Sequence, residues 1–428
     1  MLFNQTLTYI SLFSGAGVGC YGLLEEGFEC VATNEILEKR LNIQRINRKC
    51  KLDESYISGD IKKPETKEKI LKQIEFYSKK FGNDRVDLVI ATPPCQGMSV
   101  ANHKKKNDEI KRNSLVVESI DLIKQIKPRF FILENVPSFY KTGCIDKNDN
   151  LLEIGSMIEQ NLSGDYMLYD EVINFKNFGA NSSRTRTLVI GVCKEFKDFI
   201  SALEFFPDFK QEKTLKEVIG SLKPLAWGEY DSTDFYHSFR TYPKHMQEWI
   251  KDLKEGQSAF ENVQDAISDL AYLCSNEGAF ESDYLNPIQS SYQALMRKDS
   301  PKLYNHQATN HSQAALEKLK LINKEQGKEC LPKNLHGKQQ FKSTWGRLNW
   351  NKISPTIDTR FDTPSNGTNS HPELHRSITP REAARIQSFS DNYIFYGNKT
   401  SVCKQIGNAV PPLLALALGK AILKSLRK

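Results

Sequence analysis

The sequence lacks several patterns that would assign it to a specialised class of protein. It has no run of 18 apolar residues, and the apolar stretch at residues 413–423 is interrupted by Lys420 and short enough for a buried helix. The first eight residues lack the charged and apolar regions of a signal peptide. No internal repeat or low-complexity tract is present. These absences argue against a membrane protein, a secreted protein and a repeat protein.

Cysteine pairs with the spacing of a redox or disulfide motif are also missing. The chain has 9 cysteines, an odd number, and none of them form a Cys-x-x-Cys pair. We therefore expect free thiols and a location in the reducing cytoplasm.

The composition is that of a soluble globular protein. Of the 428 residues, 39% are hydrophobic, 10% aromatic and 26% charged. This length exceeds what one core usually supports, so we expect two domains or one domain with a large insertion. The formal net charge of +7 favours a polyanionic partner, although many proteins with such a charge bind none.

Strand and helix patterns alternate through the first 190 residues. Short apolar runs predict strands at residues 8–13, 30–33, 86–91, 130–133 and 187–193. Helical spacing of apolar residues predicts helices at residues 20–26, 36–49, 67–80 and 115–126. We therefore predict an α/β fold, doubly wound around a mainly parallel sheet, with the chemistry at the carboxyl ends of its strands.

The pattern changes twice after this region. From residue 194 to about residue 371 the alternation is lost, and helical spacing returns at residues 376–389 and 411–423. We predict a catalytic and cofactor-binding domain at residues 1–193, a smaller recognition domain inserted at residues 194–371, and a return to the catalytic domain at residues 372–428.

A glycine-rich turn follows the first predicted strand. Gly17, Gly19 and Gly22 have the G-x-G-x-x-G spacing of a turn that approaches a ligand closely. Glu35 ends the next predicted strand, where a carboxylate can accept hydrogen bonds from ribose hydroxyls. Together they predict an adenosine-containing cofactor, whereas the glycines alone would also suit a turn needed only for packing.

Cys95 has the surroundings of a reactive cysteine. It follows Pro93 and Pro94 where the predicted strand at residues 86–91 ends, so a rigid loop presents the thiol beside the cofactor edge. We interpret Cys95 as a nucleophile. The alternative, a buried structural cysteine, better suits Cys30 or Cys193, which lie inside apolar runs.

Charged residues are predicted at the same edge of the sheet. Glu134, in Glu134-Asn135-Val136, follows an apolar strand, and burial would raise its pKa and make it a proton donor; helix capping is the alternative. Arg184 and Arg186 stand two residues apart just before a strand, so both guanidinium groups lie on one face. They could bind a base carbonyl, a phosphate or a carboxylate, or they could simply be a pair of surface arginines.

A basic segment connects the Cys95 loop to the next helix. Residues 99–112 contain four lysines, one arginine and one histidine. Such a segment is either a solvated loop or a lid that closes over a polyanion and neutralises its phosphates.

Taken in order, these motifs resemble the cytosine-C5 DNA methyltransferase family over about 250 residues at both ends of the chain. The motifs are Phe13-Ser14-Gly15-Ala16-Gly17, Pro94-Cys95-Gln96, Glu134-Asn135-Val136, Arg184-Thr185-Arg186, Thr379-Pro380-Arg381-Glu382-Ala383-Ala384-Arg385 and Gln405-Ile406-Gly407-Asn408-Ala409-Val410-Pro411-Pro412. The first and last of these stand nearly 400 residues apart, so the resemblance implies a discontinuous catalytic domain.

The resemblance implies a pocket for S-adenosylmethionine. Phe13 would stack on the adenine, Glu35 would hold the ribose, and Asp60 and Ile61 would contact the adenine edge. The other residues assigned to this pocket are Ser14, Gly15, Gly17, Asn34, Pro93, Leu115, Asn408 and Val410. In the family the helix after the last motif packs beside the first glycine turn and completes the pocket.

The resemblance also implies a covalent reaction that requires no metal. The Cys95 thiolate would attack carbon 6 of cytosine while Glu134 bonds or protonates ring nitrogen 3. Carbon 5 would take the methyl group, and loss of its proton and expulsion of Cys95 would restore the base. Arg186 would contact the cytosine carbonyl oxygen, and Arg184 would support the site. One departure from the family is Ser182, where glutamine is common, which leaves the hydrogen bonds near it unassigned.

The implied partner is double-stranded DNA, with the target cytosine flipped out of the helix. The residues assigned to DNA are Gln96, Ser99, Lys104, Lys105 and Lys106. Residues 194–371 would read the target sequence, although no single base-reading residue is named. A restriction-modification role with a companion endonuclease, and action as a monomer on DNA, are further hypotheses.

Three alternatives remain. A transfer RNA methyltransferase of the same family would use the same cysteine and glutamate, but such enzymes tend to have a compact recognition region, unlike the roughly 180 residues present in this chain. A nicotinamide dehydrogenase would have no use for both Cys95 and Glu134. An inactive DNA-binding protein is disfavoured because Cys95, Glu134, Arg184 and Arg186 are all intact.

Overall fold

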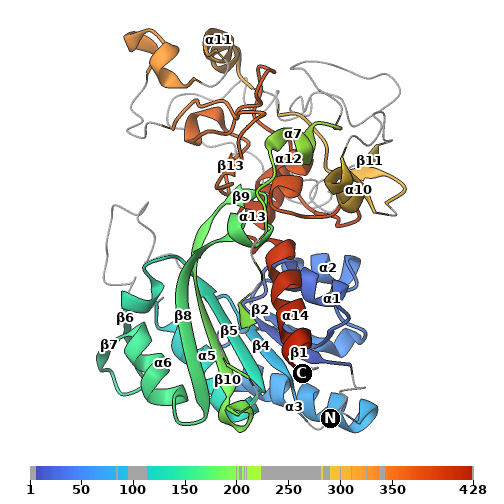
Figure 1. The fold of residues 1–428 in the computed structure, drawn as a ribbon, viewed down its shortest axis with the longest axis vertical. Coiled ribbons are helices and arrows are strands. Elements are labelled where there is room, and N and C mark those ends of the chain that lie inside the picture. Colours follow the sequence, from blue (N-terminus) through green and yellow to red (C-terminus); the bar gives the residue numbers. More distant parts are fainter. Residues whose placement is uncertain are drawn as a thin grey trace, which may run out of the picture. The chain divides into compact units, whose positions relative to one another are not determined.

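The computed structural model covers the chain as two compact units, Met1–Glu212 with Ala409–Lys428, and Lys213–Asn408 (Figure 1). The residues that the structure describes are 6–82, 85–94, 113–198, 200–201, 205–206, 208, 210–222, 281–282, 290–298, 300–309, 311–323, 326–336 and 343–426. The functional boundaries at residues 193/194 and 371/372 remain predictions, because a compact unit does not show which residues read DNA.

The first unit is built on one seven-stranded sheet with the order β3-β2-β1-β4-β5-β10-β8 (Figure 1). The strands are β1 (Thr8–Leu12), β2 (Glu29–Glu35), β3 (Tyr56–Ser58), β4 (Leu88–Ala91), β5 (Phe130–Asn135), β8 (Tyr166–Asn174) and β10 (Thr185–Cys193). Strands β3, β2, β1, β4 and β5 run parallel, and β10 runs antiparallel to both β5 and β8. The predicted α/β class with a mainly parallel sheet is confirmed.

Helices cover both faces of this sheet, which explains why its central strands are continuous apolar runs. In β4, Val89 and Ala91 face the core formed with α3 (Pro64–Phe81), α5 (Leu115–Ile126) and α6 (Ile154–Leu162). Leu88 and Ile90 face the opposite core, which contains residues of α1 (Tyr21–Glu25) and α14 (Pro412–Leu426). Alternating side chains therefore divide each strand between two cores.

The C-terminal helix α14 packs closely on α1. A Cβ atom placed on Gly22 would lie 2.1 Å from the Pro412 carbonyl oxygen and 2.4 Å from the Leu416 nitrogen, and one on Gly19 would lie 3.3 Å from Val410 Cβ. Only glycine allows the two helix backbones to approach this closely. The last helix thus packs beside the first glycine turn, as the family resemblance implied.

We expect Gly22→Ala to destabilise the first unit by about 1–3 kcal/mol or more, because the added methyl group would meet backbone atoms that cannot rotate away. Thermal or urea unfolding would measure the loss. Gly164→Ala is the matched control, since a Cβ at Gly164 meets nothing within 4 Å. Equal effects of the two substitutions would contradict the close packing of α1 on α14.

Two predicted helices are shorter than expected. Helix α2 spans Glu38–Ile46 rather than residues 36–49, because the Glu35 carboxylate accepts from the Leu37 nitrogen before the helix and Arg48 takes a positive φ of 50° after it. Helix α12 spans Pro380–Ile386 rather than residues 376–389, because Thr379 and Glu382 form a capping box that starts the helix at Pro380.

The second unit consists of short helices and connecting segments in its described part. The helices are α7 (Leu215–Ile219), α10 (Ser291–Arg297), α11 (Gln313–Leu321), α12 and α13 (Lys399–Gly407), and the short strand β11 (Glu281–Ser282) pairs with β12 (Leu303–Tyr304). Elements this short and separated by irregular backbone produce no sustained periodicity, in agreement with the loss of pattern after residue 194.

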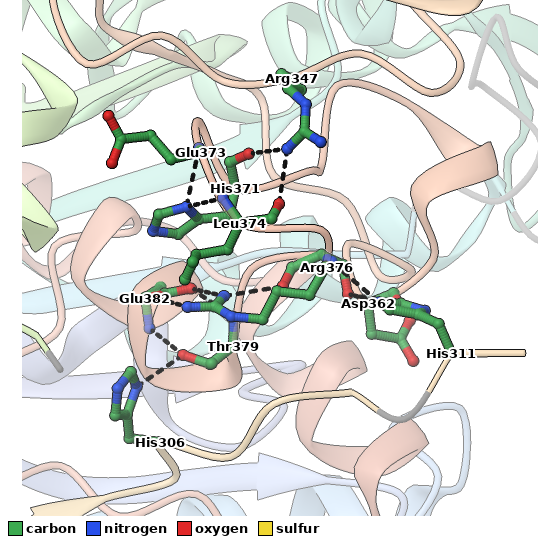
Figure 2. Close-up of polar contacts among 11 residues, drawn as sticks. His306, His311, Arg347, Asp362, His371, Glu373, Leu374, Arg376, Thr379 and Glu382 are labelled. Carbon is green, nitrogen blue, oxygen red and sulfur yellow. Dashed lines mark hydrogen bonds and ion pairs between the residues drawn. The ribbon is translucent and has the colours of Figure 1, made fainter. Parts of the chain in front are cut away.

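Buried charges organise the second unit around α12 (Figure 2). Both guanidinium nitrogens Nη1 and Nη2 of Arg376 donate to the Glu382 carboxylate, at 2.8 and 2.9 Å. Burial opposes ionisation of Glu382, but Arg376 lowers its pKa to about 2. Arg385 forms a similar pair with Asp391, at 3.0 and 2.6 Å. Since removing one partner would leave an uncompensated buried charge, these pairs make the unit sensitive to substitution.

His371 in the same network is held as a neutral imidazole. Its Nδ1 atom accepts hydrogen bonds from the backbone nitrogens of Glu373 at 3.2 Å and Leu374 at 3.0 Å (Figure 2). Burial, reinforced by the charge of Arg376, lowers the pKa of His371 to about 4. A proton on Nδ1 would displace both backbone donors, so acid must weaken this part of the unit.

We expect the second unit to lose about 2 kcal/mol of unfolding free energy between pH 7.5 and pH 5 through His371 alone. The folded pKa lies below the ordinary value near 6.5, so the unfolded chain binds more protons in this range and stability falls as the pH falls. His371→Asn keeps an acceptor for the two nitrogens but cannot titrate, and should remove this part of the loss. Urea unfolding followed by tryptophan fluorescence tests it, with His336→Asn as control; an unchanged pH dependence in His371→Asn would refute the assignment.

By length and composition, the segment Lys399–Leu426 is apolar enough to cross a membrane, but 67% of its most apolar window is buried within the described protein. The segment contains two helices, α13 and α14, with a break between Asn408 and Pro411. Burial of this kind is typical of core helices.

Candidate active site

The turn after β1 has an unusual backbone at three positions. Phe13, Gly15 and Gly17 have φ angles of 54°, 55° and 85°. Glycine adopts such angles readily, whereas Phe13 must be held in place by its surroundings. The Thr92 hydroxyl donates to the Phe13 carbonyl at 3.2 Å, so the loop after β4 supports this conformation. The turn therefore presents the half-buried ring of Phe13 at the carboxyl end of the sheet.

Glu35, at the end of β2, lies against this turn. Its Oε2 atom accepts from the Gly15 nitrogen at 2.9 Å, and its Oε1 atom accepts from the Leu37 nitrogen at 3.2 Å and from Arg40 at 3.1 Å. These bonds use three of the roughly four acceptor positions of a carboxylate. Within the part of the chain that the structure describes, one position on Oε2 stays open and suits a further donor, such as a sugar hydroxyl.

Neighbouring strand ends supply the other predicted pocket residues of the first unit. The Asn34 side chain donates to the Ile57 and Gly59 carbonyls at 3.0 and 3.2 Å, which fixes the segment leading to half-buried Asp60 and buried Ile61.

The remaining predicted pocket residues lie on several elements. Phe13 and Leu115 both pack against the same apolar core. Ser14 donates to the Asn34 carbonyl at 3.1 Å, Pro93 is buried after β4, and Val410 lies beside Gly19. Asn408 is exposed at the C-cap of α13 in the second unit.

The loop that leads to Cys95 is tied to two neighbours. The Asn135 side chain donates to the Pro93 carbonyl at 2.9 Å, and the Thr92 nitrogen donates to the Leu12 carbonyl at 3.4 Å. The start of the loop is thereby positioned between the glycine turn and the end of β5. The predicted residues Cys95, Gln96, Ser99, Lys104, Lys105 and Lys106 lie outside the described residues.

Glu134 and Arg186 form an ion pair between β5 and β10. The two strands are paired with Glu134 opposite Leu188, and Arg186 Nε lies 3.3 Å from Glu134 Oε1. This contact lacks the alignment of a hydrogen bond, and Oε1 accepts no other hydrogen bond from the described residues. Burial raises the pKa of Glu134, while the charges of Arg186 and Arg184 oppose the shift. A buried carboxyl with a free acceptor position can exchange a proton with a ligand.

Three polar residues of this site were not assigned roles from the sequence. Thr92 and Asn135 hold the described start of the loop, residues 92–94, and Gln44 on α2 bonds to the glycine turn. Thr92 precedes Pro93 and Asn135 follows Glu134, so their position next to predicted site residues could have indicated their role. Gln44 falls three residues after buried Leu41, at a helix position where an apolar residue is expected. A polar residue on an apolar helix face was the signal there.

Metal ligands are not grouped in the described part of the chain. No set of three or more His, Cys, Asp or Glu side chains within it is arranged to hold a metal ion. What the described residues can hold is an adenosine-type ligand at the glycine turn, with a titratable carboxyl nearby on the same edge of the sheet.

The sheet order, the glycine turn after β1 and the carboxylate at the end of β2 define the fold class of the S-adenosylmethionine-dependent methyltransferases. The fold is similar to that of a prophage-encoded E. coli protein solved as a candidate DNA modification methyltransferase. That chain superposes with a TM-score of 0.62 at 24% identity, covering 99% of this chain and 100% of the other.

Within that class, the chain belongs to the C-5 cytosine-specific DNA methylases, whose family model matches residues 7–424. It is 30% identical over 357 residues to the type II methyltransferase M.DdeI of Desulfomicrobium norvegicum, covering 79% of this chain and 72% of the relative. It is 25% identical over 425 residues to M1.HphI of Haemophilus parahaemolyticus, covering 99% and 88%. The chain is therefore a DNA (cytosine-5)-methyltransferase, as its motifs predicted.

Proposed function

We propose that the chain methylates a specific cytosine in duplex DNA by covalent catalysis through Cys95, with S-adenosylmethionine as the methyl donor. The observation that carries this proposal is the hydrogen bond from Asn135 to the Pro93 carbonyl. Asn135 follows Glu134 directly, and Pro93 stands two residues before Cys95. The bond therefore supports a site in which the Cys95 thiol and the Glu134 carboxyl act on one base.

The residues at the glycine turn fit the proposed donor. Phe13 offers an aromatic face for the adenine, the acceptor position that the described residues leave open on Glu35 suits a ribose hydroxyl, and Asp60 and Ile61 would contact the adenine edge. Bound there, the donor would supply an electrophilic methyl group on a sulfonium. Ser14, Gly15, Gly17, Asn34, Pro93, Leu115, Asn408 and Val410 complete the proposed pocket.

The chain's own residues would act on the cytosine. The Cys95 thiolate forms a bond to carbon 6, and the ring electrons pass towards nitrogen 3, where Glu134 donates a hydrogen bond or a proton. Carbon 5 becomes nucleophilic. After its methylation the carbon 5 proton is lost to solvent, nitrogen 3 returns any proton that it received to Glu134, and the Cys95 sulfur leaves with its electron pair. Arg186, already paired with Glu134, contacts the carbonyl oxygen, and Arg184 supports the pair.

We further propose that residues 194–371 read the DNA sequence and that the enzyme is the modification half of a restriction-modification system. The names of the type II relatives support the second point. Gln96, Ser99, Lys104, Lys105 and Lys106 would contact the DNA, and the net charge of +7 agrees with a polyanionic substrate.

The seven cysteines in the described part are free, which supports a cytoplasmic location. We expect a monomer on DNA.

Transfer of a labelled methyl group tests the proposal. Purified protein and methyl-labelled S-adenosylmethionine would be incubated with genomic duplex DNA in one arm and with transfer RNA in the other. Label in DNA alone, followed by bisulfite sequencing to locate the methylated cytosines, is the expected result. Label in transfer RNA alone would overturn the choice of substrate, and no label in either would favour an inactive DNA-binding protein.

A further inference from the structure

Gln44 lies beneath the glycine turn, and both the nitrogen and the oxygen of its side-chain amide form hydrogen bonds. It is fully buried on α2, and its Nε2 atom donates to the Ser14 hydroxyl at 2.8 Å and to the Gly15 carbonyl at 2.7 Å. Its Oε1 atom accepts from the Thr33 hydroxyl at 2.8 Å. One side chain therefore joins the turn after β1 to strand β2.

The orientation of this amide is fixed by a buried lysine. Lys49 is 3% exposed, and its ammonium donates to the Thr33 hydroxyl oxygen at 3.0 Å. An ammonium has no lone pair to accept with, so the Thr33 proton must point away from Lys49. It points to Gln44 Oε1, which leaves the two amide protons facing the turn. The chain of bonds runs from Lys49 through Thr33 and Gln44 to Ser14 and Gly15.

The same side chain also shapes the turn sterically. A Cβ atom at Gly17 would lie 2.6 Å from Gln44 Cγ, so the stem of Gln44 occupies the space beneath that glycine. The bonded residues Ser14 and Gly15 are those around which the backbone takes positive φ angles, and Gly15 in turn donates to Glu35. A shift of Gln44 would therefore move both the turn and the Glu35 carboxylate, which is proposed to hold the ribose.

We propose that Gln44 is a positioning residue for the methyl donor, acting through the Ser14–Gly15 backbone and oriented by Thr33 and Lys49. This inference rests on the proposed donor pocket. It assigns to Gln44 no contact with the donor and no part in the chemistry at cytosine. Its loss should therefore weaken binding of the donor without slowing the methyl transfer of a fully loaded enzyme.

Gln44→Met and Gln44→Glu separate the hydrogen bonds from the packing. Both keep the stem beneath Gly17, but methionine makes none of the three amide bonds, and glutamate has no proton for the Gly15 carbonyl when it is ionised. We expect each to raise the KM for S-adenosylmethionine and the Kd for S-adenosylhomocysteine by at least about 10-fold, with kcat within about 3-fold and the KM for DNA unchanged. Thr33→Val, which removes the orienting hydroxyl together with its bond from Lys49 but keeps the Gln44 amide, should give a smaller rise of about 3-fold in both constants.

Gln73→Met and Gln73→Glu are the matched controls. Gln73 is also buried in the first unit, but it donates to Ser55 at 3.0 Å, away from the turn. These variants should lower thermal stability to a similar degree and leave the constants for the donor unchanged. If Gln44→Met fails to fold, Thr33→Val still tests the proposal.

A fall in kcat with unchanged donor binding, or loss of stability alone in the Gln44 variants, would show a merely structural role and overturn the inference. Failure of the donor pocket itself has a different signature, because the wild-type protein would then bind no S-adenosylhomocysteine. Wild-type binding with Gln44 variants that match it would refute the role of Gln44 and leave the proposed function intact.

Discussion

Cys95→Ala is expected to lower kcat for methyl transfer to DNA by at least about 10⁴-fold. Without the thiolate no bond forms at carbon 6, and carbon 5 of a neutral cytosine is too weak a nucleophile to accept a methyl group. Binding of S-adenosylhomocysteine, measured by calorimetry, should persist within about 3-fold, because the proposed pocket for the donor does not include the thiol. Incorporation of labelled methyl groups into DNA measures the loss.

Cys193→Ala is the control for this experiment, since Cys193 ends β10 and bonds to Arg85. It should retain turnover close to that of the wild type. A second assay uses DNA containing 5-fluorocytosine, in which carbon 5 carries no proton to lose after methylation. The wild-type protein should form a complex with this DNA that survives denaturing gels, and Cys95→Ala should not. Turnover retained in Cys95→Ala would refute the covalent mechanism.

Glu134→Gln is expected to lower kcat by about 10²–10⁴-fold, the usual range for a residue that transfers a proton. An amide keeps the size of the side chain and one donor, but it cannot pass a proton to ring nitrogen 3. Burial raises the pKa of Glu134, so a larger share of this carboxyl stays protonated than in solvent at a given pH. If the protonated form is the donor, kcat/KM falls as the pH rises through this raised pKa.

The pH profile distinguishes this role from a structural one. We expect the alkaline limb that belongs to Glu134 to disappear in Glu134→Gln. Glu171→Gln is the control, because Glu171 pairs with Leu188 from the other side of β10 but is exposed on the edge strand. It should keep both the rate and the profile. An unchanged profile in Glu134→Gln, with only the rate lowered, would count against proton transfer by Glu134.

Much of the fold was predictable because its strands are buried on both faces. Strands β1, β4 and β5 read as short apolar runs, and each was placed within about two residues of its position. Strand β8 was missed, because it lies at the edge of the sheet and carries polar residues such as Asp170 and Glu171. An edge strand with an exposed face lacks the apolar run that marks a central one.

In the candidate site, the residues at strand ends were predictable, whereas the residues that support them were not. The glycine turn, Glu35 and Glu134 stand next to strand ends, so a parallel topology places them at one edge without further information. The bonds of Thr92 and Gln44 to the glycine turn and of Asn135 to Pro93 join residues 29 to 79 positions apart. No local pattern specifies such a partner, because its position depends on how the strands and helices pack.

The sequence by itself determined the family, the order of the motifs and the α/β class, because glycine spacing, proline and apolar periodicity act on local backbone. The tertiary structure decided how these residues support one another. It buries Glu134, which raises the pKa of this carboxyl against the opposing charge of Arg186, and it closes α14 onto α1 at Gly22. It also places Gln44 beneath the turn that follows β1. Burial, electrostatic pairing and close packing depend on distances in space, which spacing along the chain does not contain.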